Sequence, residues 1–175
     1  MHKNSQKRYY LENAIYFITT RTKNGFPYFK YPILAEYMME LIKMGSIYRR
    51  CDLFGFVVIP NHIHILLQPV SRYTISDYMH YVKRHASRNI NILISKYPIP
   101  AGEDGHPRLR RVVSFPNKFE WLKSFHDHII RDDDDFEAHI DYLRLNPIKH
   151  GLVKEGEYYP FIYINGELIR KFFDS

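Results

Sequence analysis

The sequence predicts a single α+β domain whose elements follow the order β-α-β-β-α-β, with a further helix after them. Short runs rich in β-branched and aromatic residues alternate with longer segments whose apolar residues recur at helical spacing. Turn signals separate these segments, the clearest being Asn24-Gly25 and Pro60-Asn61. The chain has 175 residues, of which 45% are hydrophobic, and this suffices for one core.

The first half of the chain contains three predicted strands and one predicted helix. Residues 14–22 (AIYFITTRT) are typical of a strand, because β-branched and aromatic residues dominate the run. Residues 53–60 and 62–69 are apolar runs that meet at a proline, which predicts two adjacent central strands. A helix is expected to begin at Pro32 and to run to the basic pair 49–50. The residues predicted to share one face of this helix are Ile33, Tyr37, Leu41 and Met44.

The second half contains two further helices and one strand. Residues 74–94 open with a Thr/Ser-type cap and predict a helix, whereas 95–111 combine prolines, glycines and charges as an exposed loop does. Residues 121–131 predict a strand, and 132–147 predict a helix that starts on acidic residues and stops at its proline. The tail, 156–175, shows only weak signals for short strands. The apolar stripe of the helix at 74–94 comprises Ile75, Met79, Val82, Ala86 and Ile90.

This order of elements is the split βαβ arrangement of a ferredoxin-like antiparallel sheet, with helices on one face and a C-terminal helix after it. We expect one domain over residues 1–175, with a core at about 9–155. The second face of the sheet is then free for a ligand.

Charge and composition narrow the class of partner. The formal net charge is +6 and the pI is about 9.3, which favours a polyanion such as nucleic acid, the alternative being a merely basic protein. The single cysteine, Cys51, excludes an internal disulfide framework and a cysteine-rich zinc site. The N-terminus (MHKNSQKRYY) is polar and basic with no apolar core of signal-peptide length, and no apolar stretch approaches the length of a membrane span, so we expect a cytoplasmic protein with no membrane partner.

Two histidines interrupt the apolar run at 62–69. Alternate residues of a strand share a face, so His62 and His64 point together, away from the packed side that holds Ile63 and its apolar neighbours. Neutral imidazole is a common metal ligand, and both rings are within reach of one divalent ion. Two ligands are too few for a site, and the alternative is a pair of surface or hydrogen-bonded histidines.

The predicted C-terminal helix offers a third ligand and a nucleophile. Tyr142 and Asn146 are four residues apart and therefore share a helix face. The Asn146 amide oxygen could complete a metal site, and the Tyr142 phenol oxygen could attack a phosphodiester that the metal polarises. Such a reaction leaves a covalent phosphotyrosine and a free hydroxyl, and its energy is kept for transfer to a second strand. The alternative is a half-buried tyrosine that only packs.

The segments at 57–67 (VVIPNHIHILL) and 125–153 (FHDHIIRDDDDFEAHIDYLRLNPIKHGLV) closely resemble the REP-associated tyrosine transposases. These are single-tyrosine relatives of the small insertion-sequence transposases of the HUH superfamily, and the resemblance covers most of residues 9–155. It implies that Tyr142 is the nucleophile and that His62, His64 and Asn146 bind Mg²⁺ or Mn²⁺. Family members cut and rejoin single-stranded DNA at or near hairpin-forming palindromic repeats, leaving a 5′-phosphotyrosine and a 3′-hydroxyl.

The chain departs from the family pattern before the histidine pair at 126–128. Trp121-Leu122-Lys123 stands where relatives usually have a Trp-Gln-Arg-like stretch, which bears on DNA specificity more than on catalysis. His126 and His128 share a strand face, and a structural or supporting role is favoured over direct metal binding. The acidic run 132–135 is interpreted as a helix cap.

The resemblance leaves two hypotheses for function: a metal-dependent endonuclease and strand transferase, or a non-cleaving module that binds hairpin DNA or RNA. The expected partner is single-stranded or hairpin DNA, bound by a monomer or a homodimer. Candidate phosphate contacts are Lys83, Arg84, Arg88, Arg108, Arg110 and Arg111, and candidate stacking residues are Tyr9, Tyr10 and Tyr28.

Overall fold

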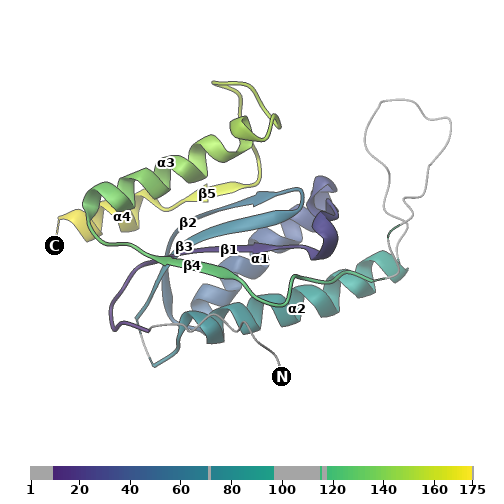
Figure 1. Ribbon diagram of the computed structural model, residues 1–175, viewed down its shortest axis with the longest axis horizontal. Helices are drawn as coiled ribbons and strands as arrows, with labels where there is room; N and C mark the ends of the chain where they lie inside the picture. The colour runs from purple at the N-terminus through teal and green to yellow at the C-terminus, as the bar shows by residue number, and fades with distance from the viewer. Residues whose placement is uncertain (1–9, 71, 97–114, 116–117, 175) are drawn as a thin grey trace.

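The computed structural model describes residues 10–70, 72–96, 115 and 118–174 (Figure 1). Helices and strands alternate along the chain in the predicted order, followed by a short strand and a last helix. Two short 3-10 turns, Lys23–Gly25 and Tyr28–Lys30, join β1 to α1. The strands are β1 (Tyr16–Arg21), β2 (Cys51–Ile59), β3 (His62–Pro69), β4 (His126–Ile129) and β5 (Ile162–Ile164), and the helices are α1 (Pro32–Tyr48), α2 (Ile75–Lys96), α3 (Asp133–Lys149) and α4 (Gly166–Phe173).

The sheet has five strands in the order β4-β1-β3-β2-β5, and every neighbouring pair is antiparallel. β2 and β3 pair as a hairpin, which confirms that the two apolar runs form adjacent strands, and β3 is the central strand. The α+β class and the ferredoxin-like order of elements are therefore confirmed. The register between β1 and β3 places Thr19 opposite His64 and Arg21 opposite His62.

Helices cover both faces of the sheet rather than one. α1 and α2 lie on one side and α3 and α4 on the other (Figure 1). Ile63, Ile65 and Leu67 belong to the core under α1 and α2. A second core is formed by residues from the other side of the sheet and from α3. Its residues are Ile15, Phe17, Phe54, Val57, Ile59, Leu66, Phe136, Ile140 and Leu143. The face expected to be free for a ligand is thus partly covered.

The buried face of α2 is as predicted, but that of α1 is not. In α2 the whole predicted stripe is buried, and Thr74 and Asp77 exchange capping hydrogen bonds at its start. In α1, Ile33 and Met44 are 51% and 40% exposed. Apolar residues occur on both sides of α1, so their spacing alone does not select the face that packs. The buried residues of α1 are Leu34, Ala35, Met38, Leu41, Ile42, Gly45 and Ser46.

The helix α3 begins as predicted and ends two residues later than predicted. Asp132 caps its start, because the Asp132 carboxylate accepts a hydrogen bond from the Asp135 backbone N–H at 2.8 Å. Pro147 lies inside the last turn, where its missing N–H costs the helix one internal hydrogen bond. The helix instead ends before Gly151, whose φ of 65° stops further turns.

Three more predicted segments differ from the structure. The strand expected at 121–131 is confined to β4, with Trp121 forming an isolated bridge to Thr22. The tail contains α4 as well as a short strand, and the Asn165 side chain caps α4 by accepting from the Leu168 N–H. The loop expected at 95–111 begins with the last two residues of α2, and the rest lies outside the described residues. Among the described helices, none has the length and apolar character needed to cross a membrane.

Candidate active site

The central strand β3 places His62 and His64 on the face that packs against α3. Each histidine is only 4% exposed, and their ring centroids are 4.8 Å apart. Ile63 points to the opposite core, which confirms the predicted alternation. The pair was expected on an open face and is buried instead, because α3 lies across it.

The amide of Asn61 fixes which nitrogen of His62 carries a lone pair. Asn61 Nδ2 donates to the Gly25 carbonyl oxygen at 3.4 Å, so its Oδ1 is the atom that lies 2.6 Å from His62 Nδ1. An amide oxygen only accepts, and therefore His62 Nδ1 carries the proton. The lone pair is then on His62 Nε2, which suits a metal ligand held by an outer hydrogen bond.

His64 is held in a similar way by its cross-strand neighbour. Thr19 Oγ1 lies 2.7 Å from His64 Nδ1, across the β1–β3 register. His64 Nε2 is buried and has no hydrogen-bond partner among the described residues. A buried nitrogen without a partner is costly unless something else binds it.

The helix α3 brings the predicted nucleophile and third ligand over these histidines. The Tyr142 ring is half-buried and stands at 88° to the His64 ring, with centroids 5.1 Å apart. Two turns later the His150 ring lies 5.0 Å from His62. Asn146 is midway between these two contacts on the same helix face and is 1% exposed. Both polar atoms of its side chain lack a partner in the described part of the chain.

These atoms form a donor set that fits a divalent cation. Burial, followed by repulsion from His150 and Arg21, lowers the pKa of His62 to about 4. Burial lowers the pKa of His64 to about 3, with His62 as the next cause. Both imidazoles are therefore neutral at pH 7 and can donate a lone pair. Together with the amide oxygen of Asn146 they offer two nitrogen ligands and one oxygen ligand.

Other residues around Tyr142 define its surroundings. Phe17 contacts both Tyr142 and His64, with ring centroids 5.6 Å and 5.3 Å away. The Lys149 ammonium lies 4.8 Å from the centroid of the Tyr142 ring, a cation–π contact. A positive charge thus stands over the Tyr142 ring.

The predicted DNA contacts on α2 have different surroundings. Lys83 Nζ donates to the carbonyl oxygens of Leu122 and Ser124, at 2.6 Å and 3.1 Å, so it ties α2 to the segment before β4. Arg84 and Arg88 are exposed. A groove of about 510 Å³ lies between α2 and residues 118–125, and its basic lining residues are Lys83, Arg84, Lys118 and Lys123. Arg108, Arg110 and Arg111 lie outside the described residues.

Three tyrosines were predicted to stack on DNA bases, and for Tyr28 this prediction is wrong. Tyr28 is 2% exposed and its hydroxyl donates to the Lys118 carbonyl oxygen, so its ring is part of the core. Tyr10 is 49% exposed and its hydroxyl lies 2.7 Å from Ser76 Oγ. Tyr9 is outside the described residues.

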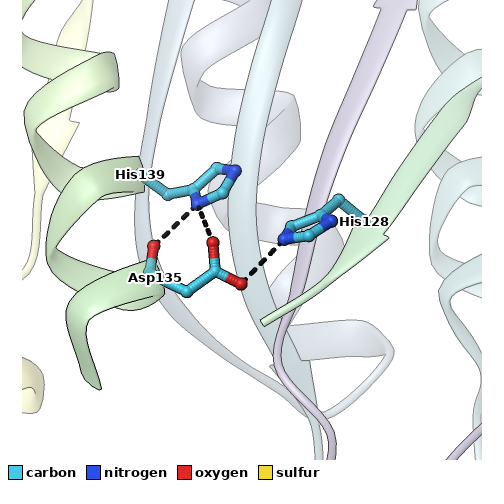
Figure 2. Close-up of side chains that lie close together, drawn as sticks. All are labelled: His128, Asp135 and His139. Atoms are coloured by element: carbon cyan, nitrogen blue, oxygen red, sulfur yellow. Dashed lines mark hydrogen bonds and ion pairs between the residues drawn. The ribbon is translucent and has the colours of Figure 1, made fainter. Parts of the chain in front are cut away.

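The sequence did not identify three residues that organise the site or its surroundings. Asn61 and Thr19 orient the two strand histidines. The role of Thr19 could have been found only from the strand register. His139 joins His128 and Asp135 in a cluster between β4 and α3 (Figure 2). His128 was expected in a supporting role, and Asp135 was interpreted as part of a cap; its carboxylate instead faces the two histidines.

Comparison with known proteins gives a family-level match. The family model described as "Transposase IS200 like" matches residues 10–98, a little more than half of the chain. The matched span includes β1 to α2 and contains His62 and His64. Tyr142 and Asn146 lie beyond it.

Two curated relatives extend the likeness over most of the chain. A Haemophilus influenzae protein named as a REP-associated tyrosine transposase is 26% identical over 166 residues, covering 89% of this chain and 82% of the relative. The REP-associated tyrosine transposase of Escherichia coli is 24% identical over 173 residues, covering 94% and 84%. The resemblance inferred from the sequence is thereby confirmed.

A solved structure shares the fold. It is that of a REP-associated tyrosine transposase bound to a REP hairpin, which matches with a TM-score of 0.69 at 20% identity. The match covers 91% of this chain and 82% of that chain.

Proposed function

Because this chain belongs to the IS200-like transposase family, we propose that it is a metal-dependent single-stranded DNA endonuclease and strand transferase. It acts at hairpin-forming palindromic repeats through a covalent 5′-phosphotyrosine intermediate. The observation that carries the proposal is the set of buried donor atoms beside Tyr142. His64 Nε2 and both polar atoms of Asn146 are unpartnered in the described part of the chain, and these residues adjoin Tyr142 across the sheet and along α3, where one bound cation would engage them.

In this proposal His62, His64 and Asn146 hold Mg²⁺ or Mn²⁺. When bound there, such an ion would supply polarisation of a non-bridging phosphate oxygen and would stabilise negative charge in the transition state. The neutral imidazoles follow from burial, which keeps the pKa of both histidines well below 7. Asn61 and Thr19 hold the two rings so that their Nε2 atoms stay available.

Tyr142 acts as the nucleophile. Its phenol oxygen attacks the phosphorus, the bond from phosphorus to the 3′ oxygen breaks, and the 3′ oxygen leaves as a hydroxyl after gaining a proton. The phenol proton is lost to solvent. The 5′ end remains attached to Tyr142, and a 3′-hydroxyl of another strand reverses the step. Lys149, beside the Tyr142 ring, supplies positive charge for the incoming phosphate.

The DNA partner is a REP-type hairpin with a single-stranded flank. The names of both curated relatives and of the solved complex point to REP elements. Arg84 and Arg88 are exposed and suit contacts to phosphate, as do the predicted arginines at 108, 110 and 111, whereas Lys83 already donates to backbone carbonyl oxygens. The substitution Arg84→Gln tests the contact between Arg84 and phosphate. If the contact exists, the affinity for the hairpin should fall less steeply with salt concentration in the variant than in the wild type. An unchanged slope of affinity against salt concentration would exclude Arg84 from the interface.

A covalent adduct is the direct test. The protein is incubated with labelled single-stranded hairpin DNA from its own genome, with Mn²⁺ or with a chelator, and then denatured. The wild type should form a metal-dependent adduct that maps to Tyr142. Tyr142→Phe should bind the hairpin and form none. Tyr158→Phe is the matched control, because Tyr158 is 83% exposed and its loss should leave the adduct unchanged.

The result also separates the two hypotheses drawn from the sequence. Tight hairpin binding without an adduct, with metal and hairpin sequence varied, would favour a module that binds without cleaving. An adduct on another residue would show that Tyr142 is not the nucleophile, while the proposal of covalent DNA cleavage would stand.

A further inference from the structure

A second group of metal-ligating side chains lies between β4 and the first turns of α3. His128 comes from β4, and Asp135 and His139 lie one turn apart on α3. One ligand atom from each of the three lies within 4.8 Å of the others. Figure 2 shows both imidazoles turned toward the carboxylate of Asp135. His128 Nε2 is 2.8 Å from Asp135 Oδ2, and His139 Nδ1 is 3.1 Å from Asp135 Oδ1.

The surroundings of Asp135 keep it charged. Its side chain is 9% exposed, and hydrogen bonds from His128 and Arg131 outweigh burial and lower its pKa to about 2. The carboxylate is therefore an anion at every physiological pH. Arg131 Nε is 3.2 Å from Asp135 Oδ2, but the Arg131 side chain is 73% exposed and can leave without repacking the core.

Phe17 contacts both this group and the proposed active site. The Phe17 ring contacts His139 with centroids 4.5 Å apart and contacts His64 with centroids 5.3 Å apart. The two groups thus each contact the same aromatic ring. They also differ in chemistry, because only the group at β4 includes a carboxylate.

We propose that His128, Asp135 and His139 form a second cation site, for a borderline divalent ion of the zinc type. Two imidazoles and one carboxylate are a typical three-residue zinc set, and two ligands four residues apart on a helix can reach one ion. His128 is 40% exposed, which leaves room for water as the fourth ligand. The anionic oxygen and two nitrogens favour zinc over magnesium, which prefers oxygen ligands and keeps several waters.

Binding replaces the hydrogen bonds within the cluster and rearranges its protons. In the metal-free form the His139 Nδ1 lies 2.7 Å from the backbone oxygen of Asp135, where an N–H donates. A zinc ligand of this kind keeps its N–H on the imidazole nitrogen that faces away from the ion, while the other nitrogen donates a lone pair. No oxidation or group transfer is involved.

This site would fasten β4 to the helix that carries Tyr142. β4 is a four-residue edge strand, and His139 precedes Tyr142 by three residues on α3. The role is that of a positioning site, since none of its ligands contacts Tyr142 among the ring contacts of the described residues. The proposed zinc site does not depend on DNA cleavage, so zinc binding can be tested without DNA.

Zinc alone is titrated into metal-free full-length protein by calorimetry, in a His64→Gln background that disables the first site. In that parent, His128→Gln and His139→Gln should each weaken zinc binding by at least about tenfold. His126→Gln is the matched control, because His126 is an exposed histidine on the same strand outside the cluster. It should bind zinc like the parent.

Thermal unfolding gives a second readout. At about a hundredfold excess of zinc over Kd, the parent Tm should rise by about 5–10 °C, and the rise should be lost in His128→Gln. His128 is partly exposed, so this variant carries the test if His139→Gln does not fold. Equal zinc affinity in all three variants, or no binding by the parent at about 1 mM zinc, would show that the cluster is only hydrogen-bonded and would overturn the proposal.

Discussion

Single hydrogen bonds determine what the strand histidines are able to bind. His62 and His64 each have Nδ1 engaged by a neighbouring side chain, Asn61 in one case and Thr19 in the other. The second nitrogen of each ring is left for a ligand. In a metal site such outer partners set the orientation and basicity of the ring, so they influence affinity without touching the ion.

Removing the Thr19 hydroxyl should therefore weaken metal binding. Thr19→Val keeps the shape of the side chain and removes the partner of His64 Nδ1, and we expect the Mn²⁺ concentration for half-maximal adduct formation to rise about 10–100-fold. Thr20→Val is the control, because Thr20 is the next residue of β1 and its buried hydroxyl has no partner among the described residues. If the two variants require the same Mn²⁺ concentration, Thr19 does not position His64.

The depressed pKa values of the same histidines predict how stability depends on pH. In metal-free protein the pKa of His62 is about 4 and that of His64 about 3, against 6.5 for an ordinary histidine. Between about pH 6.5 and pH 4 the unfolded chain binds more protons than the native chain, so the free energy of unfolding falls as the pH falls, by a few kcal/mol. Asp135, with a pKa of about 2 against 3.8, acts only below about pH 4.

Urea unfolding in the presence of a chelator, at pH 7 and at pH 4.5, measures this loss. His64→Gln should reduce the difference between the two pH values, because one of the two titrating groups is gone. A variant that loses as much stability as the wild type would show that His64 does not titrate in this range.

Local spacing was enough to suggest part of the candidate site, and strand register was needed for the rest. Tyr142 and Asn146 follow from a separation of four residues on one helix, and His62 and His64 from alternation in one strand. Thr19 is 45 residues away from His64 in the chain and meets it only through the β1–β3 pairing. No periodicity in the sequence predicts that strand pairing.

At the level of elements, predictability depended on how one-sided the apolar pattern is. The stripe of α2 is flanked by charged residues, so the buried face could be predicted, whereas α1 is apolar on more than one side. The helix α4 was missed because it has only eight residues. Its N-cap, Asn165, is nevertheless visible in the sequence.

A single glycine allows β5 and α3 to pack against β2. A Cβ at Gly55 would lie 2.9 Å from the Tyr163 carbonyl oxygen and 3.1 Å from Leu143 Cδ1. Gly55→Ala must therefore displace the backbone of β5, and we expect it to lower the free energy of unfolding by about 1–3 kcal/mol in urea. Gly166→Ala, where nothing lies within 4 Å of the added atom, should change it by less than about 0.5 kcal/mol. Similar values for both would mean that β5 adapts freely.

At the level of the whole molecule, one chain assembles all the proposed active-site residues. α3 crosses the sheet of its own chain, so that Tyr142 contacts His64 of the same molecule (Figure 1). This arrangement supports a monomer that is competent by itself, although it is also compatible with a dimer of two complete sites.

Mixing two inactive variants tests this arrangement. Tyr142→Phe and His64→Gln each lack one part of the site, and a site formed within one chain cannot be restored by combining them. We expect no adduct from the mixture under conditions in which the wild type forms one. An adduct would require Tyr142 of one molecule to act at the histidines of another, and would show that α3 changes partners.

The proposed ligands and the nucleophile come from only two elements, the strand β3 and the helix α3. The phenol oxygen of Tyr142 belongs to a half-buried ring, whereas the hydrophobic core around it is built by other residues. Under the proposed function, a lineage of such proteins can therefore lose cleavage through one nucleotide change in its gene and keep a folded domain. In genomes that retain this fold without mobile copies, the tyrosine codon is the place where such a loss should be visible first.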